Sequence, residues 1–365
     1  MKLDVKLKII DWYIIRKFIG TYFFSLVLII CIIVVFDLSE KIEKFIVNQA
    51  PLNAVVFDYY LRLIPYFASL FSPLFVFITV IFFTSKMAAN TEIVAILSNG
   101  ISFKRVMYPY FISAFILAVF SLVLNLFIIP PSTKIRQDFE NKYIRKAYVN
   151  SDYNIHFQLN ANEYVYMSSF DTYSGMAQRF SLERHEDGEL KSKLMSNFAR
   201  FDTATNAWRI SEYFIRTINE TGSDSISTGS DLDTVINLNY ADLASRDNVV
   251  EAMDFFELKN YYNQQVLRGA GNTDIILIEQ HQRIAMPFST FILTLIGVSL
   301  SSRKVRGGIG LHIGVGIGLG FTYILFMQFS KMFVQGGLTS AGIAVWIPNM
   351  LFALVGFVLY KIAPK

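Results

Sequence analysis

Residues 18–36 read FIGTYFFSLVLIICIIVVF, a run without a single charged side chain. A helix needs about twenty apolar residues to cross the hydrocarbon core of a bilayer, so this run predicts a membrane span. The composition agrees, because 53% of the 365 residues are hydrophobic and 15% are aromatic. These fractions are too high for a soluble enzyme of this length, and the chain is therefore interpreted as a membrane protein.

Five further spans are predicted. They cover about residues 64–83, 108–129, 284–300, 309–329 and 343–362. The second span contains Pro65 and Pro73, which neighbouring helices can accommodate, whereas the third is expected to stop at Pro130 and Pro131. No cleavable signal peptide is expected, because the first run is long enough to span and lacks a small-residue cleavage site. The residues just before it, 9–15, are expected to form an interfacial helix.

Charge separates the spans from a polar middle segment. Between Pro131 and Glu279 lie 22 of the 29 acidic residues but only 15 of the 33 Lys and Arg residues. We therefore divide the chain into an N-terminal membrane half (1–130), an inserted domain (131–280) and a C-terminal membrane half (281–365). Lys and Arg gather at both ends of the chain and after the second and fourth spans, so these segments are assigned to the cytoplasm. The acidic insertion then lies on the opposite side of the membrane.

The insertion alternates apolar and polar residues over short runs. These runs are YNIHFQ (153–158), NEYVYMS (162–168), AQRFSLER (177–184), LKSKLMSNF (190–198), AWRISEYFIRTI (207–218) and DTVINLN (233–239). Turn formers separate them, as in HEDGE (185–189) and TGSDS (221–225), and together they predict an all-β sandwich or jelly roll. The only cysteine, Cys31, lies in the first span, so no disulfide can support this domain. Residues 251–268 predict an amphipathic helix leading to the fourth span.

A much shorter helix is predicted between the second and third spans, where residues 90–102 read NTEIVAILSNGIS. Asn90 and Thr91 favour a helix start and Gly100 favours its end, so the helix has about two to three turns and cannot cross a bilayer. The residues sharing its apolar face are Ile93, Ile96 and Leu97, joined by Val94 and Ala95. This helix could lie against lipid headgroups or fill a groove on a cytosolic protein, and the pattern decides neither.

Catalytic motifs are absent from the sequence. It contains no GxxxxGK[ST] loop for nucleotide phosphates, no HExxH and no GxSxG. Its four histidines are scattered and lack metal-ligand spacing. The chain is therefore expected to be no enzyme, to hold no metal or cofactor of its own, and to take the energy for any work from a partner.

Six stretches resemble the LptF/LptG (YjgP/YjgQ) permease family of the lipopolysaccharide exporter. They are LDVKLKIIDWYIIRKF (3–18), TEIVAILSNGIS (91–102), AWRISEYFIR (207–216), FFELKNYYNQQVLRGAGN (255–272), EQHQRIAMPFSTFILTLIGVSLSSRKVRGG (279–308) and VWIPNMLFALVGF (345–357). The resemblance covers essentially the whole chain. It implies an inner-membrane ABC transporter subunit of Gram-negative bacteria, with six transmembrane helices, a periplasmic jelly roll and both termini in the cytoplasm.

The resemblance also implies partners and a reaction. A paralogous permease would form a heterodimer with this chain, and a dimer of the ATPase LptB would bind the ATP and Mg. Lipopolysaccharide would be extracted from the periplasmic leaflet and passed through the jelly roll to the LptC and LptA bridge, for delivery to the outer membrane. The length and the opening IDWYIIRKF lean toward LptG rather than LptF. The alternative is a membrane-anchored periplasmic receptor or assembly scaffold without transport activity.

The same resemblance assigns functional residues. The short helix would couple the chain to the ATPase through Glu92, Ile93, Ala95, Ile96, Leu97 and Gly100. The candidate substrate-binding residues are Lys41, Lys44, Phe157 and Tyr166. The two lysines follow the first span and could contact lipid phosphates. Alternatively, they are solvated side chains at a helix end, beside Glu40 and Glu43. The two aromatic residues are expected in the jelly-roll interior.

Two further features have competing interpretations. The glycines Gly310, Gly314 and Gly318 in the fifth span predict close helix packing, within the chain in preference to a subunit interface. The basic residues after the fourth span are Arg303, Lys304 and Arg306. They are expected to set the topology and contact anionic headgroups, with a contact to the ATPase as the second possibility.

Overall fold

The structure is a computed structural model that describes residues 8–145, 153–202, 205–218, 224–238, 243, 247–267, 273–303 and 308–363. The chain forms two compact units. The membrane unit comprises residues 1–139 and 277–365, and the β unit comprises residues 140–276.

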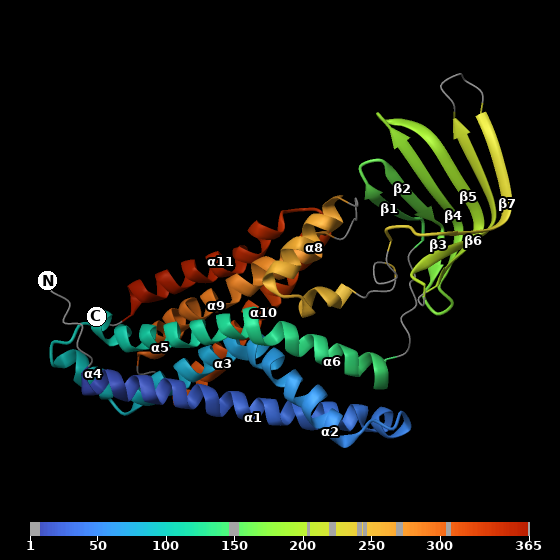
Figure 1. Cartoon of the computed structure of the whole chain (residues 1–365). Helices are drawn as coiled ribbons and strands as arrows, with labels where there is room; N and C mark the ends of the chain where they lie inside the picture. Colours follow the sequence, from blue (N-terminus) through green and yellow to red (C-terminus); the bar gives the residue numbers. More distant parts are fainter. Residues whose placement is uncertain are drawn as a thin grey trace. The chain divides into compact units, whose positions relative to one another are not determined.

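Helices make up the membrane unit (Figure 1). They are α1 (Ile9–Val47), α2 (Leu52–Ala54), the π-helical turn η1 (Val55–Tyr60), α3 (Leu61–Ala89), α4 (Glu92–Ser98), α5 (Phe103–Val123), the π-helical turn η2 (Leu124–Ile128), α6 (Ile129–Tyr143), α9 (Thr273–Ser301), α10 (Gly308–Gln335) and α11 (Ala341–Ile362). By residue number, α6 ends and α9 begins within the β unit. Six continuous helical segments of the described chain are long and apolar enough to cross a membrane. The six predicted spans are therefore confirmed, and each helix extends beyond the predicted apolar run.

The first helix has no separate interfacial part. The residues expected to form one are instead the first turns of α1, which continues without a break to Val47. No proline or glycine interrupts the chain before Gly20, and Ile14, Ile15 and Phe18 are buried in the bundle. Continued burial along one face therefore favours a single long helix.

The prediction that the third span stops at Pro130 and Pro131 is wrong. Both prolines lie in the first turn of α6, which continues α5 through the π-helical turn η2. A proline ring crowds the preceding helical turn and provides no N–H donor. The wider π-helical turn immediately before the prolines accommodates them, so the helix continues to Tyr143.

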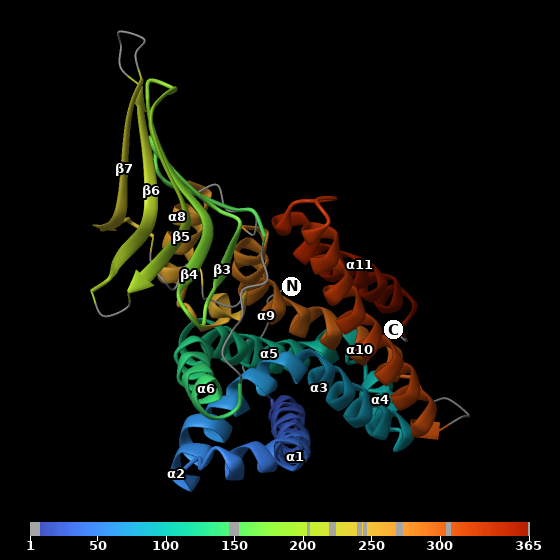
Figure 2. The same ribbon diagram turned by 90° about the vertical axis from the view of Figure 1, so that its right-hand side faces the viewer.

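The membrane unit has two hydrophobic clusters that meet on α3. The first includes Phe18, Val80 and Tyr110 from α1, α3 and α5. The second joins α3 to α9, α10 and α11 around residues such as Phe77 and Tyr323. Helix α3 packs against both α1 and α10 (Figure 2) and is the most buried span, with 67% of its apolar stretch buried. Its prolines, Pro65 and Pro73, lie inside the helix as predicted.

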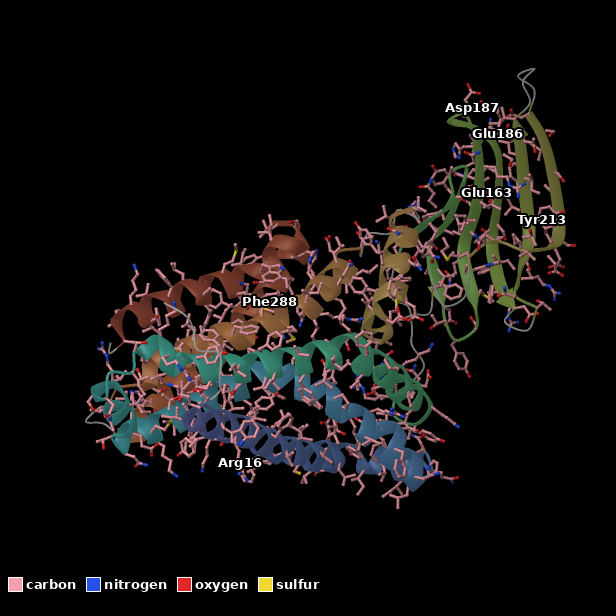
Figure 3. The ribbon with its side chains drawn as sticks, turned by 60° about the vertical axis from the view of Figure 1, so that its left-hand side comes forward. Arg16, Glu163, Glu186, Asp187, Tyr213 and Phe288 are labelled. Atoms are coloured by element: carbon pink, nitrogen blue, oxygen red, sulfur yellow. The ribbon has the colours of Figure 1, made fainter. Side chains whose placement is uncertain are left out.

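The β unit contains seven strands and one amphipathic helix in its described residues. The strands are β1 (Ile155–Asn160), β2 (Glu163–Met167), β3 (Ser169–Asp171), β4 (Met176–Glu186), β5 (Glu189–Asp202), β6 (Ala207–Ile218) and β7 (Asp224–Thr234). They form one antiparallel sheet in the order β1-β2-β4-β5-β6-β7, with β3 paired to β4 (Figure 1). The insertion is thus an all-β domain of jelly-roll type. The HEDGE turn is confirmed, with Asp187 and Gly188 at positive φ at the β4–β5 tip (Figure 3).

The last strand differs from the prediction. The TGSDS stretch was expected as a turn, but its Asp224 and Ser225 already belong to β7, while residues 221–223 lie outside the described residues. The DTVINLN stretch was expected as a strand, but β7 ends at Thr234 and the following Ile236 and Leu238 pack into the core of the sheet. Because β7 is an exposed edge strand, its side chains do not alternate in hydrophobicity.

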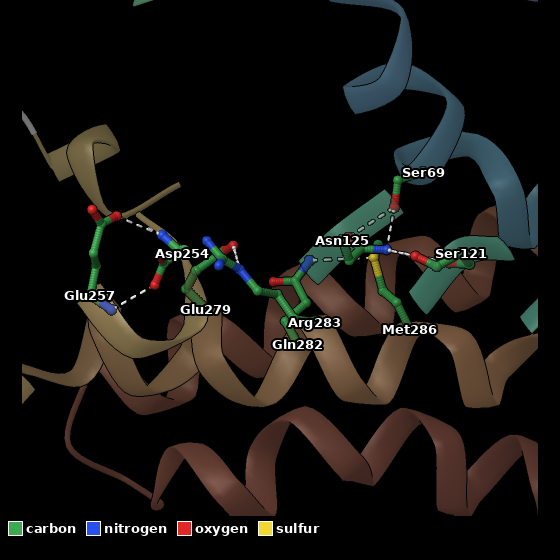
Figure 4. Close-up of polar contacts among 9 residues, drawn as sticks. All are labelled: Ser69, Ser121, Asn125, Asp254, Glu257, Glu279, Gln282, Arg283 and Met286. Carbon is green, nitrogen blue, oxygen red and sulfur yellow. Dashed lines mark hydrogen bonds and ion pairs between the residues drawn. The ribbon is translucent and has the colours of Figure 1, made fainter. Parts of the chain in front are cut away.

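The amphipathic helix predicted at residues 251–268 is α8 (Phe255–Leu267), preceded by the 3-10 turn η3 (Asp247–Ala252). Asp254 caps it, because its Oδ1 accepts from the backbone N–H of Glu257 at 2.7 Å. The Glu257 carboxylate in turn accepts from the backbone N–H of Asp254 at 2.9 Å (Figure 4).

Candidate functional site

Helix α4 begins and ends where the sequence predicts. Thr91 stands at its N-cap with φ +63°, and Gly100 follows its C-cap with φ +79°. The Asn99 side-chain amide donates to the carbonyl of Ala95 at 2.6 Å and closes the last turn. Two left-handed residues therefore isolate this short helix from α3 before it and α5 after it.

The apolar face of α4 packs against the chain itself. Ile93 is 1% exposed, and Ile96 and Leu97 pack beside it on the cluster formed by α1, α3 and α5. Ile93 is therefore buried in its own chain and is not available to fill a groove on a partner. Ile96 and Leu97 are only half-buried, and their coupling role stays a prediction. The side chains that α4 leaves open belong to Val94, which is 55% exposed, and to Ala95.

Three other residues complete this outer surface. Ser98 and Gly100 are exposed, and Glu92 is half-buried with its Oε1 accepting from the Asn90 amide at 3.1 Å. We call the surface of Glu92, Val94, Ala95, Ser98 and Gly100 the outer face of α4. Of the predicted coupling residues, it retains Glu92, Ala95 and Gly100. The sequence pattern missed Val94 because helical periodicity groups residues by face without showing what covers each face.

An ion pair beside α4 was not predicted. Arg105, in the first turn of α5, binds Asp11, in the first turn of α1, through two parallel contacts of 2.6 and 2.5 Å. Asp11 is fully buried. The sequence signal for this contact was weak, because Asp11 is one of two acidic residues, with Asp4, in a mostly basic and apolar N-terminal segment.

The two candidate lysines differ in their surroundings. Lys41 lies 2.5 Å from Asp37 Oδ1 on the same helix and also donates to the hydroxyl of Tyr59. Tyr59 is fully buried, comes from the π-helical turn η1, and donates to Asp37 Oδ2 at 3.0 Å. Lys44 is exposed. The acidic partner of Lys41 is thus Asp37, while the neighbouring Glu40 and Glu43 are exposed.

Phe157 and Tyr166 lie on opposite faces of the sheet. Phe157 is paired with Val165 and packs against the core of the β unit. Tyr166 alternates with buried Val165 and Met167, and its ring contacts that of His156 at 4.8 Å on the other face. The expectation that both residues face one interior is therefore wrong for Tyr166.

Polar side chains inside the spans also have partners that the sequence does not reveal. Arg283 on α9 is buried, and its Nε lies 2.8 Å from Glu279 Oε1, one turn earlier (Figure 4). Asn125 donates to Ser69 Oγ at 2.8 Å and to the carbonyl of Ser121 at 2.7 Å, which joins η2 to α3. Such pairing offsets the cost of placing polar groups where water is scarce.

The glycines of α10 that contact another helix are not the ones predicted to do so. A Cβ atom added at Gly310, Gly314 or Gly318 would meet no atom within 4 Å, so these residues do not pack helices together within the chain. The close contacts are at Gly316 and Gly320, where a Cβ atom would lie 2.4 Å from Ile81 and 2.6 Å from Leu74. The neighbouring set of glycines therefore brings α10 against α3, and the predicted set is exposed.

Valine substitution should separate these two sets. Gly316→Val is expected to lower the free energy of unfolding by about 1–3 kcal/mol, because the added atoms overpack the contact with Ile81. Gly318→Val is expected to leave it nearly unchanged. The measurement is the thermal unfolding of both purified variants in the same detergent. Equal destabilisation by the two substitutions would contradict this packing.

The first and fifth spans leave the most apolar surface open. Only 22% of the apolar stretch of α1 and 28% of that of α10 are buried, against 67% for the span that contains α3.

Arg303 is exposed at the end of α9, whereas Lys304 and Arg306 lie outside the described residues. Within the described part of the chain, no three His, Cys, Asp or Glu side chains gather as they would around a metal ion.

The comparison with protein families agrees with this architecture. A family model described as lipopolysaccharide export system permease LptF/LptG matches residues 12–362, nearly the whole chain. No individual curated protein matches the chain. Six membrane helices, an inserted jelly-roll-type domain and a match over this length lead to one assignment. The chain belongs to the LptF/LptG family of lipopolysaccharide export permeases.

Proposed function

We propose that this inner-membrane permease extracts lipopolysaccharide from the periplasmic leaflet and passes it through its jelly-roll domain toward the outer membrane. In this proposal both termini and α4 are cytoplasmic and the β unit is periplasmic. The observation that carries it is the outer face of α4. A short helix held between two spans by its apolar side, with Val94 and Ala95 exposed, can receive force from a second protein.

ATP hydrolysis is assigned to a partner. The sequence contains no phosphate-binding loop, so a dimer of the ATPase LptB would hold the ATP and Mg. Closure of that dimer would push on the outer face of α4. The energy of nucleotide binding would then reach a chain that has no nucleotide site.

The open sides of α1 and α10 support a second permease subunit. Their apolar stretches are the least buried of the six, and the exposed glycines of α10 would allow a neighbouring helix to approach closely. A paralogous permease facing them would enclose an apolar cavity for the acyl chains. Lys44, and Lys41 if it leaves Asp37, would contact the lipid phosphates.

The β unit would carry the lipid onward to an LptC and LptA bridge. Phe157 lies on the core-facing side of the sheet, where acyl chains would find apolar side chains. The strand β7 lies at the end of the sheet order, so its outer edge could pair with a strand from the bridge.

A photoreactive residue at Phe157 tests the proposal. With ATP and the ATPase subunit present, we expect a crosslink to lipopolysaccharide that falls at least about tenfold without nucleotide, because vectorial transfer consumes ATP. Tyr166 is the matched control, since it lies on the opposite face of the same hairpin. Equal labelling at Phe157 with and without ATP would instead support a passive receptor or scaffold.

A further inference from the structure

The ion pair between Asp11 and Arg105 joins two segments that are far apart in sequence. Both guanidinium nitrogens contact the two carboxylate oxygens, at 2.6 and 2.5 Å. The Asp11 side chain is 1% exposed, and its Oδ2 also accepts from the backbone N–H of Lys8 at 2.8 Å. The geometry is bidentate, and the Asp11 carboxylate is shielded from water while the Arg105 side chain is 26% exposed, so the contact is directional.

The position of the pair connects it to α4. Arg105 lies in the first turn of α5, which begins directly after the segment that leaves α4 at Gly100. Its backbone N–H donates to the Ser102 hydroxyl at 3.4 Å, which caps α5. The chain therefore leads from the end of α4 directly into the turn of α5 in which Arg105 binds Asp11 of α1.

The other end of the contact is a long helix that packs on α3 and α5 by one face and leaves most of its apolar stretch open. Helix α1 runs from Ile9 to Val47, and only 22% of its apolar stretch is buried. Asp11 lies near its start, so a shift at this point can move the exposed length of α1 as one element. Removing either partner would break the connection. Removing Arg105 would also leave the buried carboxylate of Asp11 without its charged partner, whereas the Arg105 side chain is 26% exposed.

We propose that the Asp11–Arg105 pair is the mechanical connection by which displacement of α4 reaches α1. Both are positioning residues in this proposal, which rests on the proposed function because it assumes that a partner ATPase acts on α4. The pair adds a specific path to that function: from the outer face of α4, through Arg105 and Asp11, to the helix that borders the lipid cavity.

The only cysteine of the chain provides the readout. Cys31 is exposed on α1, so an environment-sensitive fluorophore on its thiol reports movement of this helix. In the complete transporter, ATP is expected to shift the emission of the wild-type protein. Asp11→Asn should abolish this shift and reduce ATP-dependent export at least tenfold, while the amount of ATPase that co-purifies stays unchanged. A purely structural role would reduce assembly and export together.

Two further variants control the experiment. Asp233→Asn removes another bidentate arginine pair, with Arg209 in the β unit, and should keep the full fluorescence shift. The second control is the double variant Asp11→Arg with Arg105→Asp, which reverses both charges. It should restore part of the fluorescence shift that Asp11→Asn loses. It also tests the proposal if Asp11→Asn does not fold.

The outcomes are distinguishable. An undiminished shift in Asp11→Asn, or a folded double charge-reversal variant without any shift, overturns the connection while the proposed function stands. A wild-type permease that brings down no ATPase overturns the proposed function itself, and with it the connection.

Discussion

Replacing Ala95 with tryptophan is expected to reduce the recovery of a co-purified ATPase at least about tenfold, which corresponds to about 1.4 kcal/mol of binding free energy. Ala95 is exposed on the outer face of α4, where a large ring would hold a docked partner away. The fold should be unaffected, because the hydrogen bonds from Ser98 and Asn99 at this position are accepted by the backbone carbonyl of Ala95. The measurement is ATPase activity eluted with the tagged permease.

Ile93→Ala is the matched control on the inner face. Ile93 is 1% exposed, so its truncation is expected to lower the free energy of unfolding by about 2–5 kcal/mol through lost contacts and a new cavity. The fraction that remains folded should still bring down the ATPase. If Ala95→Trp bound normally and folded Ile93→Ala did not, the assignment of the two faces would be reversed.

These two residues also show where sequence reasoning about α4 ends. The start at Asn90 and Thr91, the end at Gly100 and the shared face of the apolar residues could all be read locally. Which face meets the bundle depends on how α3 and α5 approach, and that information lies in long-range packing. An apolar stripe on a short helix is satisfied equally by its own chain or by a partner.

Local patterns located the membrane and β elements well where hydrophobicity decides them. Continuous apolar runs gave the six spans, and alternation gave β4, β5 and β6. The pattern failed at β7, whose exposed side chains pair with β6 through contacts such as Arg209 with Asp233. It failed again at Pro130, because the π-helical turn directly before the prolines relieves a clash that a local rule treats as ending the helix.

Ion pairs in the membrane unit were the least accessible to sequence reasoning. Asp11 and Arg105 are distant in the chain, and only the packing of α1 beside α5 brings them together. Asp37 and Lys41 are one helical turn apart, so their contact was within reach of the i to i+4 rule, but the contribution of Tyr59 depends on the position of η1.

Trp208→Ala is expected to damage the β unit without disturbing ATPase binding. Trp208 is fully buried, its ring centre lies 5.5 Å from that of Phe180 and 5.4 Å from that of Phe201, and its indole N–H donates to the carbonyl of Leu238 at 3.4 Å. Truncating a buried tryptophan costs about 3–5 kcal/mol of stability. Cleavage within residues 153–238 by a protease acting on the intact permease should therefore accelerate more than about a hundredfold.

The functional result expected from Trp208→Ala is the opposite of that from Ala95→Trp. The outer face of α4 belongs to the membrane unit, so the ATPase should co-purify normally, while delivery of lipopolysaccharide beyond the permease should stop. Phe198→Ala is the matched control, because Phe198 is 50% exposed on the same sheet and its removal leaves the core intact. If export continued after the β unit of Trp208→Ala had been cleaved, the lipid would have to leave the membrane by a route that does not use this domain.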